Sequence, residues 1–249
     1  MWKVILLVGA LTLMAQEPGD RRLLSLPDSP EMNRRAPDVA HVRLETTRGV
    51  IRLEMRRAWA PRGVDRFYNL VRHGFYDQAA VFRVRAGTWA QFGINGDPAI
   101  AQAWRTRTIP DDPRVESNVR GAVSFAFKDR DGRTTQVFIN LRDNSAAHDA
   151  EPFVPIGKVI EGMNVADGFY SDYGEQAGGG IRGGKQQPLF AGGNDYLKRN
   201  FPHLDQFRKQ RSNSSRSVKA LKSSHELDAG SADVPSATRQ QARRIFRWD

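Results

Sequence analysis

The sequence of 249 residues contains no cysteine. The chain therefore has no disulfide bond, no thiolate nucleophile and no zinc site with cysteine ligands, although this absence does not identify its compartment. Its five histidines are scattered and form no HxH or HxxxH pair, so we expect no metal site. The sequence also contains no Gly-x-Ser-x-Gly motif and no phosphate-binding loop motif. It therefore has no sequence signal of a serine hydrolase or of a nucleotide-binding enzyme.

Two local patterns could indicate catalysis or cofactor binding, but both are better interpreted as a turn or a loop. Asp111 and Asp112 are adjacent carboxylates flanked by Pro110 and Pro113, which favours a solvated turn over an acid/base pair. The run 174–184 is rich in glycine but follows no clear strand, so we interpret it as a flexible loop rather than a dinucleotide site. We therefore expect no cofactor.

The amino terminus has the features of an export signal. A basic start precedes an uncharged apolar run from Val4 to Ala15. The run is shorter than the roughly 20 residues that cross a bilayer, so we expect no stable membrane span. A basic start, a short apolar stretch and a small residue at its end are typical of a secretory signal. We predict that residues 1–15 are a signal peptide and that the protein is exported, to a periplasm, the cell exterior or a secretory lumen. A buried strand and a signal-anchor are the alternatives.

The chain is strongly basic, with a formal net charge of +10 and a pI near 10.3. Such a balance favours contact with polyanions and says nothing about the fold. Residues 206–249 contain few large apolar side chains, so we predict a basic, disordered tail. Because the charges are dispersed without interleaved aromatic residues, we expect only weak polyanion contact and no nucleic-acid partner.

Hydrophobic periodicity predicts several short strands with one or two helices, which favours a closed or nearly closed antiparallel barrel. Residues 16–40 are rich in Pro, Asp, Arg and Ser and predict a linker. Apolar residues alternate over 42–55, which is the pattern of a β-hairpin. A helical period follows over 60–74, with Pro61 in the first turn and Gly74 at the end. We expect further strands at 81–84, 121–126, 136–139 and 154–160, a short helix at 163–169, and long loops at 96–118 and 142–153.

Five blocks between residues 41 and 170 follow one another with a characteristic spacing. They are APRGVDRFYNLVRHGFYD at 60–77, Val81-Phe82-Arg83-Val84, Ser117-Asn118-x-Arg120-Gly121-x-Val123-Ser124-Phe125-Ala126, Gln136-x-Phe138-Ile139-Asn140, and Ile156-Gly157-Lys158-Val159-Ile160-Glu161-Gly162-Met163. Together they resemble the cyclophilins. The resemblance implies a mainly β domain over residues 41–205, a closed eight-stranded antiparallel barrel with capping helices. It also implies peptidyl-prolyl cis-trans isomerase activity on proline-containing polypeptides, without a cofactor.

Residue by residue, the resemblance implies a catalytic set. The family's catalytic arginine matches Arg83, its groove glutamine matches Gln91, and the phenylalanine that forms the floor of its proline pocket matches Phe138. Its backbone-contacting alanine matches Ala126. Isomerisation breaks no bond, so it needs a group that stabilises the twisted amide rather than a nucleophile or a metal. A fixed guanidinium beside the prolyl nitrogen does this, a glutamine can support it, and a flat ring can hold the pyrrolidine.

The chain departs from the family pattern around this predicted pocket. Thr88 stands where the family usually has a pocket phenylalanine, with Trp89 next to it, and Phe153 aligns with the family's pocket histidine. Ala147-His148-Asp149 aligns with the Trp-Leu-Asp stretch of many members. We therefore expect Trp89, His148 and Phe153 to contact the substrate and to rebuild part of the apolar wall.

The sequence thus predicts an exported isomerase that acts on X–Pro bonds of exported or unfolded polypeptides and assists their folding. The rebuilt pocket motivates an alternative, a non-catalytic module that binds proline-containing peptides, but the retention of Arg83 and Gln91 argues against it. A polyanion-binding protein with a basic tail is a second alternative, which the dispersed charge makes weaker.

Overall fold

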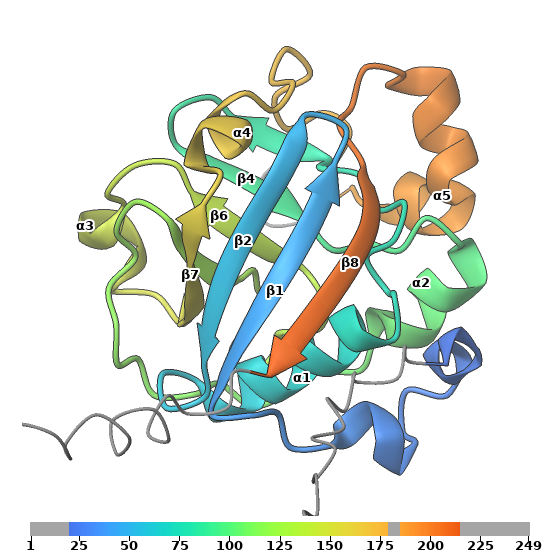
Figure 1. Ribbon diagram of the computed structural model, residues 1–249. Helices are drawn as coiled ribbons and strands as arrows, with labels where there is room; N and C mark the ends of the chain where they lie inside the picture. The colour runs from blue at the N-terminus through green and yellow to red at the C-terminus, as the bar shows by residue number, and fades with distance from the viewer. Residues whose placement is uncertain (1–19, 179–184, 215–249) are drawn as a thin grey trace, which may run out of the picture. The chain divides into compact units, whose positions relative to one another are not determined.

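The computed structural model describes residues 20–178 and 185–214, in which eight strands form one antiparallel sheet (Figure 1). The strands lie side by side in the order β3-β4-β6-β5-β7-β2-β1-β8. Their bounds are β1 Val39–Thr46, β2 Gly49–Arg56, β3 Arg83–Arg85, β4 Trp89–Phe92, β5 Ala122–Phe125, β6 Val137–Asn140, β7 Pro155–Glu161 and β8 Phe207–Ser214. The predicted signal peptide lies outside the described residues, as does the part of the predicted tail beyond 214.

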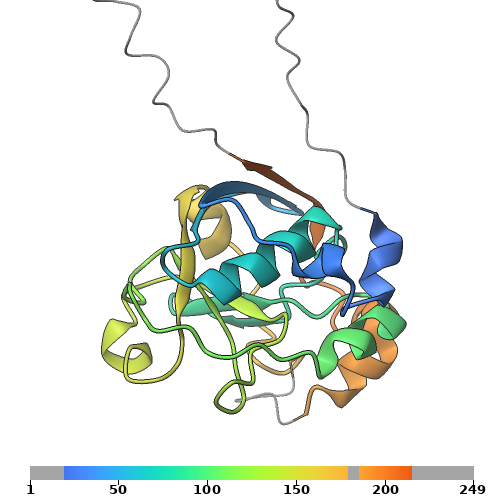
Figure 2. The ribbon, with the colours of Figure 1, turned by 90° about the horizontal axis from the view of Figure 1, so that it is seen from below.

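The fold is mainly β, as the sequence predicted, but the expected closure of the barrel is wrong. In the described part of the chain, β3 and β8 are the two edges of the sheet and no ladder joins them. An isolated bridge between Ala80 and Gln206 links the segments that lead into these two strands. The sheet is therefore a strongly curled half-barrel that wraps around the core (Figure 2).

Helices pack against the curled sheet. The described ones are the 3-10 helices η1 Arg21–Ser25 and η2 Pro30–Asn33, and the α-helices α1 Pro61–Arg72, α2 Pro98–Arg105, α3 Ser145–His148, α4 Met163–Asp167 and α5 Gln187–Asn200. Helix α1 contacts β2, β7 and β8, and its Val64, Phe67 and Val71 are buried at helical spacing. No helix among these residues combines the length and apolar character that crossing a membrane requires.

The predicted hairpin is confirmed and supplies part of the core. Strand β1 pairs with β2 so that Val42 lies opposite Leu53 and Leu44 lies opposite Ile51. All four side chains are buried, because alternate residues of a strand face the same side of the sheet.

The segment that was expected to be a linker is packed onto the domain. Leu24 of η1 and Met32 of η2 are fully buried. The indole nitrogen of Trp104 in α2 donates a hydrogen bond of 2.8 Å to the carbonyl of Leu24. The buried Leu24 and Met32 dock this segment onto the domain, so its polar composition was misleading.

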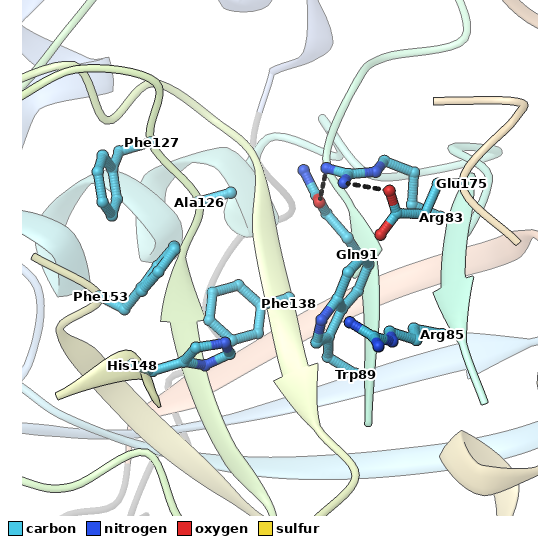
Figure 3. A pocket seen from close by; sticks show the side chains of 10 residues that line it. All are labelled: Arg83, Arg85, Trp89, Gln91, Ala126, Phe127, Phe138, His148, Phe153 and Glu175. Carbon is cyan, nitrogen blue, oxygen red and sulfur yellow. Dashed lines mark hydrogen bonds and ion pairs between the residues drawn. The ribbon is translucent and has the colours of Figure 1, made fainter. Parts of the chain in front are cut away.

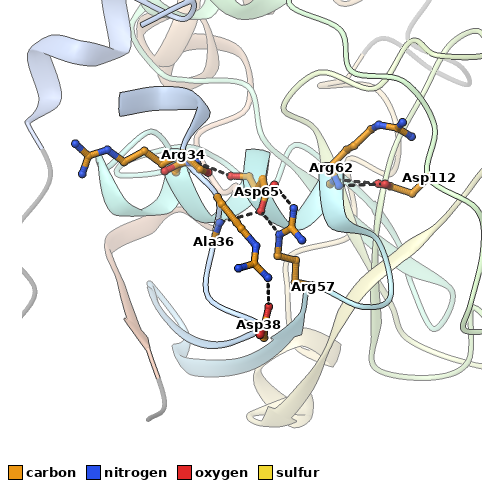
Figure 4. A network of polar contacts seen from close by, with 10 residues as sticks. Arg34, Ala36, Asp38, Arg57, Arg62, Asp65 and Asp112 are labelled. Atoms are coloured by element: carbon orange, nitrogen blue, oxygen red, sulfur yellow. Dashed lines mark hydrogen bonds and ion pairs between the residues drawn. The ribbon is translucent and has the colours of Figure 1, made fainter. Parts of the chain in front are cut away.

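A carboxylate on α1 fixes the end of this amino-terminal segment (Figure 4). Asp65 accepts a hydrogen bond of 2.8 Å from the backbone nitrogen of Ala36. The same carboxylate accepts two bonds from Arg57, at 2.8 Å and 2.9 Å. The three contacts join the chain before β1, the turn after β2 and helix α1.

The predicted solvated turn at the acidic pair is also wrong. Asp112 is buried and accepts hydrogen bonds from the backbone nitrogens of Arg62 and Gly63, at 3.0 Å and 2.9 Å (Figure 4). A carboxylate at this position satisfies donors that have no partner within the helix. Arg133 reaches both acids, at 3.0 Å from Asp111 and 3.1 Å from Asp112. Asp112 therefore has a structural role in the interior, and the partly buried Asp111 lies beside the same arginine.

Regular structure also lies in segments that were predicted to be loops or tail, and α3 lies within the predicted loop 142–153. Helix α2 lies within the predicted loop 96–118, and Asp97 caps it by accepting a bond of 2.8 Å from the backbone nitrogen of Ala99. Strand β8 lies within the predicted tail and pairs with β1, which extends the domain beyond 205. The expected short helix after β7 is present as α4.

Candidate active site

The register of three neighbouring strands aligns the residues of the predicted catalytic set. Arg83 on β3 lies opposite Gln91 on β4, and Gln91 lies opposite Phe138 on β6. Directly opposite residues of paired strands point to the same face. Ala90 and Phe92, on either side of Gln91, belong to the buried core, so the row of three faces away from that core.

The guanidinium of Arg83 is held on several sides. Its Nη1 donates a hydrogen bond of 2.7 Å to Oε1 of Gln91, and its Nη2 lies 3.3 Å from Oε2 of Glu175. The guanidinium carbon is 5.0 Å from the ring centroid of Trp89, within cation–π range. Only 6% of the residue is exposed, and this burial lowers the pKa of Arg83, while Glu175 opposes the shift. A guanidinium is the most basic side chain in proteins and stays protonated there.

Aromatic rings form the other side of the site. Phe138 meets Phe153 and His148 edge to face, each at 5.4 Å between ring centroids. Phe153 also packs against Phe127, at 4.5 Å. Edge-to-face packing of this kind fixes the rings and leaves a flat apolar surface.

These groups surround one cavity of about 210 Å³ (Figure 3). It is lined by Arg83, Arg85, Trp89, Gln91, Ala126, Phe127, Phe138, His148, Phe153 and Glu175. The structure therefore brings every predicted catalytic and substrate-contacting residue to the same cavity, and their roles remain predictions. One side of the cavity offers a cation and amides, and the other offers aromatic rings, which is a suitable arrangement for an amide next to an apolar ring.

Trp89 and His148, at positions where the chain departs from the family pattern, both line the cavity. Trp89 lines the cavity, whereas Thr88 does not, so the tryptophan and not the threonine forms the wall here. Burial lowers the pKa of His148, an effect that neighbouring Asp149 opposes. The Nδ1 atom of His148 is buried without a hydrogen-bond partner. We therefore assign to His148 a neutral, aromatic role in the wall at neutral pH.

Three lining residues were not predicted from the sequence. Arg85 lies two positions after Arg83 on β3, so strand alternation could have indicated it. Phe127 lies beyond the end of β5, where alternation does not apply. Glu175 is distant in sequence and follows no local pattern that would indicate its position.

A chain of amides supports Gln91 from behind. Its Nε2 donates a hydrogen bond of 2.8 Å to Oε1 of Gln136. The side-chain amides of Gln136 and Gln186 lie 3.0 Å apart. Gln186 comes from the segment just before α5, so the carboxy-terminal part of the domain helps to orient the glutamine beside Arg83.

A second, more polar cavity of about 350 Å³ adjoins the first. The two cavities share Arg83, Gln91, Ala126 and Phe127 and so form one continuous groove. Its far part includes Arg105.

Comparisons with known proteins identify the family of the chain. The sequence pattern of the family described as cyclophilin type peptidyl-prolyl cis-trans isomerase/CLD matches residues 41–178, more than half of the chain. A peptidyl-prolyl cis-trans isomerase of Streptomyces antibioticus is 30% identical over 136 residues, which cover 51% of this chain and 80% of that protein. A peptidyl-prolyl cis-trans isomerase-like 2 protein of Neurospora crassa is 28% identical over 137 residues, which cover 53% of this chain and only 22% of that protein.

A solved structure supports the fold. The crystal structure of a cyclophilin type peptidyl-prolyl cis-trans isomerase of Cryptosporidium parvum matches with a TM-score of 0.51 and 17% sequence identity, covering 72% of this chain and 99% of that one. At this identity the match bears on the fold alone. Taken with the family pattern, it defines the class of protein: a curled β domain of the cyclophilin type. The chain belongs to the cyclophilin-type peptidyl-prolyl cis-trans isomerases.

Proposed function

We propose that the protein catalyses cis/trans isomerisation of X–Pro bonds in exported or unfolded polypeptides and thereby assists their folding. The observation that carries the proposal is the row of Arg83, Gln91 and Phe138 across three adjacent strands, facing one cavity. The family membership supports the activity, and the sequence of residues 1–15 supports the exported substrates.

The proposed mechanism uses differential binding of the twisted amide. The barrier to rotation about a peptide bond is about 18–20 kcal/mol because resonance is lost in the twisted state. In that state the prolyl nitrogen regains its lone pair, and a guanidinium N–H of Arg83 donates to it. An interaction made only there lowers the barrier without tightening the ground state.

The remaining groups hold the substrate in place. The pyrrolidine ring packs on Phe138, between Phe153 and His148, which meet Phe138 edge to face. Gln91 accepts from Arg83 through its amide oxygen and so keeps the guanidinium directed at the cavity. Ala126 directly follows β5, and its backbone nitrogen donates a hydrogen bond of 2.9 Å to the carbonyl of Gln136. Its own carbonyl can accept a hydrogen bond from an extended peptide.

An exchange assay on proline-containing peptides tests the proposal. The purified chain should accelerate cis/trans exchange well above the uncatalysed rate, which has a time constant of tens of seconds or more. Peptides that differ in the residue before proline should reveal its preference. Peptide binding without any acceleration would contradict the proposal and support the non-catalytic module.

The exported location is tested separately. Amino-terminal sequencing of material from the periplasm or the medium should find a chain that begins shortly after Ala15. An intact Met1 in a cytoplasmic fraction would contradict export and would leave the isomerase activity unaffected.

A further inference from the structure

A segment distant in sequence from the catalytic row folds over Arg83. Residues 171–178 follow α4 and make a series of turns, with hydrogen bonds from Gly174 to Ser171 and from Gln176 to Tyr173, at 2.7 Å and 2.9 Å. The backbone nitrogen of Val84 on β3 donates a bond of 3.0 Å to the carbonyl of Gly174. The segment thus attaches to the edge strand that carries Arg83.

Packing fixes this segment tightly against the arginine. A Cβ atom at Gly178 would lie 2.1 Å from Cγ of Arg83, so the main chain at Gly178 rests directly on the arginine stem. Ala177 is buried in a second apolar cluster that includes Leu189 and Phe190 of α5. The position of the segment is therefore set by α5 as well as by β3.

The segment delivers one carboxylate to the site. Glu175 lies 3.3 Å from Nη2 of Arg83, and its side chain is three-quarters covered. Among the described residues that line the cavity, it is the only acid. A buried cation is costly unless a charge or hydrogen bonds compensate it, and Glu175 provides the charge.

The contacts of Arg83 leave its guanidinium little freedom. Gln91 holds one terminal nitrogen, Glu175 holds the other, and Trp89 lies within cation–π range of the group. A planar fork held at both ends has its plane defined. Gln91 alone would leave the group able to turn about that single bond.

We infer that Glu175 is a positioning residue of the isomerase site, which acts through Arg83 by fixing the plane of its guanidinium and compensating its buried charge. This inference rests on the proposed function. A misplaced donor weakens the interaction made in the twisted state, so Glu175 affects kcat more than KM.

Two substitutions and a matched control test the inference. Glu175→Ala should lower kcat roughly tenfold, the effect of losing one hydrogen bond to a charged group, with KM nearly unchanged. Glu175→Gln should lower it less, because its amide oxygen can still accept from Arg83. Glu161→Gln is the control, since Glu161 pairs with Arg52 at 2.8 Å and is largely exposed on β7, and it should leave kcat unchanged.

A double-mutant cycle distinguishes positioning from a structural role. In an Arg83→Ala background, Glu175→Ala should have no further effect on kcat, because the residue through which it acts is gone. Additive losses, a fall in the melting temperature that accounts for the lost activity, or a rise in kcat on removing the carboxylate would each overturn the inference.

The inference can also be tested independently of catalysis. NMR relaxation of the Arg83 Nε–H group should show greater mobility in Glu175→Gln than in the wild type, and no change in the Glu161→Gln control. If the wild type proved inactive on peptides, the proposed function would fail. Equal Arg83 mobility with and without the carboxylate would overturn the positioning role itself.

Discussion

The regions around two buried arginines, Arg133 and Arg83, differ in how far each charge is compensated. Arg133 is fully buried, pairs with Asp111 and Asp112 at 3.0 Å and 3.1 Å, and donates to the carbonyl of Pro110. Arg83 has one carboxylate, Glu175, and faces a cavity. Both lie near an aromatic ring, so the ring does not distinguish them.

The difference separates a structural cation from one available for chemistry. The two acids around Arg133 provide more negative charge than the guanidinium needs, and one of them also caps α1. The charge of Arg133 is therefore fully compensated within the fold. The charge of Arg83 is opposed by one partly exposed carboxylate, which leaves the cation able to interact with an amide in the cavity.

The largest expected effect is on stability, from Arg133→Ala. The substitution leaves the buried Asp112 without its cation, and breaking a buried ion pair in this way costs about 3–5 kcal/mol. Thermal melts followed by circular dichroism should show a large fall in melting temperature. Below that temperature, the isomerase activity per folded molecule should stay the same. A stable but inactive variant would contradict the structural assignment.

Arg83→Ala should have the opposite profile. Loss of the donor should lower kcat at least tenfold, which corresponds to about 1.4 kcal/mol of transition-state stabilisation. Stability should change by no more than about 1 kcal/mol, because Glu175 is partly exposed and can be solvated once its partner is gone. Arg83→Lys, which keeps the charge without the planar fork, should stay well below wild type. Full activity in Arg83→Ala would contradict its role.

The two regions also differ in what the sequence could reveal. Arg83 and Phe138 lie on strands that the apolar runs predicted, whereas Gln91 was assigned by the family resemblance and its strand β4 was not predicted. Strand register places the three in one row. The role of Asp112 was not visible, because it depends on a helix some 50 residues earlier in the chain. No local pattern indicated Glu175 as a partner of Arg83, because the two residues are also far apart in the chain. Long-range contacts follow from the three-dimensional packing rather than from any local pattern.

The elements that were not predicted are also of two kinds: one had a local sequence signal, and the others depend on long-range contacts. Helix α2 had a local signal, since Asp97 followed by Pro98 is a typical helix start, and it was overlooked. Strand β8 is polar over most of its length and is identified by its pairing with β1. The docking of η1 depends on Leu24 and its contact with Trp104, which no composition analysis would indicate.

The next prediction concerns protonation of His148, which lines the same cavity as Arg83. Burial lowers the pKa of His148 and of His73, so the unfolded chain binds protons more readily than the folded chain. Their contribution to stability is present above about pH 6.5, the ordinary histidine value, and is lost as the pH falls below it. His148→Phe should make the melting temperature less sensitive to pH between 7.5 and 5.5. His203→Asn, at an exposed position, is the control and should keep the wild-type dependence.

The smallest expected effect is at Thr88, next to the ring that stacks on Arg83. Its hydroxyl makes one long, exposed contact of 3.4 Å with the carbonyl of Ala86, and it does not line the cavity. Its carbonyl accepts hydrogen bonds from the backbone of Leu141 and the side chain of Asn144, and both survive substitution by alanine.

Thr88→Ala should therefore change stability by less than about 0.5 kcal/mol and kcat/KM by less than roughly twofold. Trp89→Leu, one residue further on, is the matched comparison. It removes the ring beside the Arg83 guanidinium and should lower kcat/KM severalfold. The exchange assay and thermal melts on both variants measure these effects. If Thr88→Ala were the more damaging of the two, the wall of the cavity would be built around the threonine, and the assignment of Trp89 to that wall would be wrong.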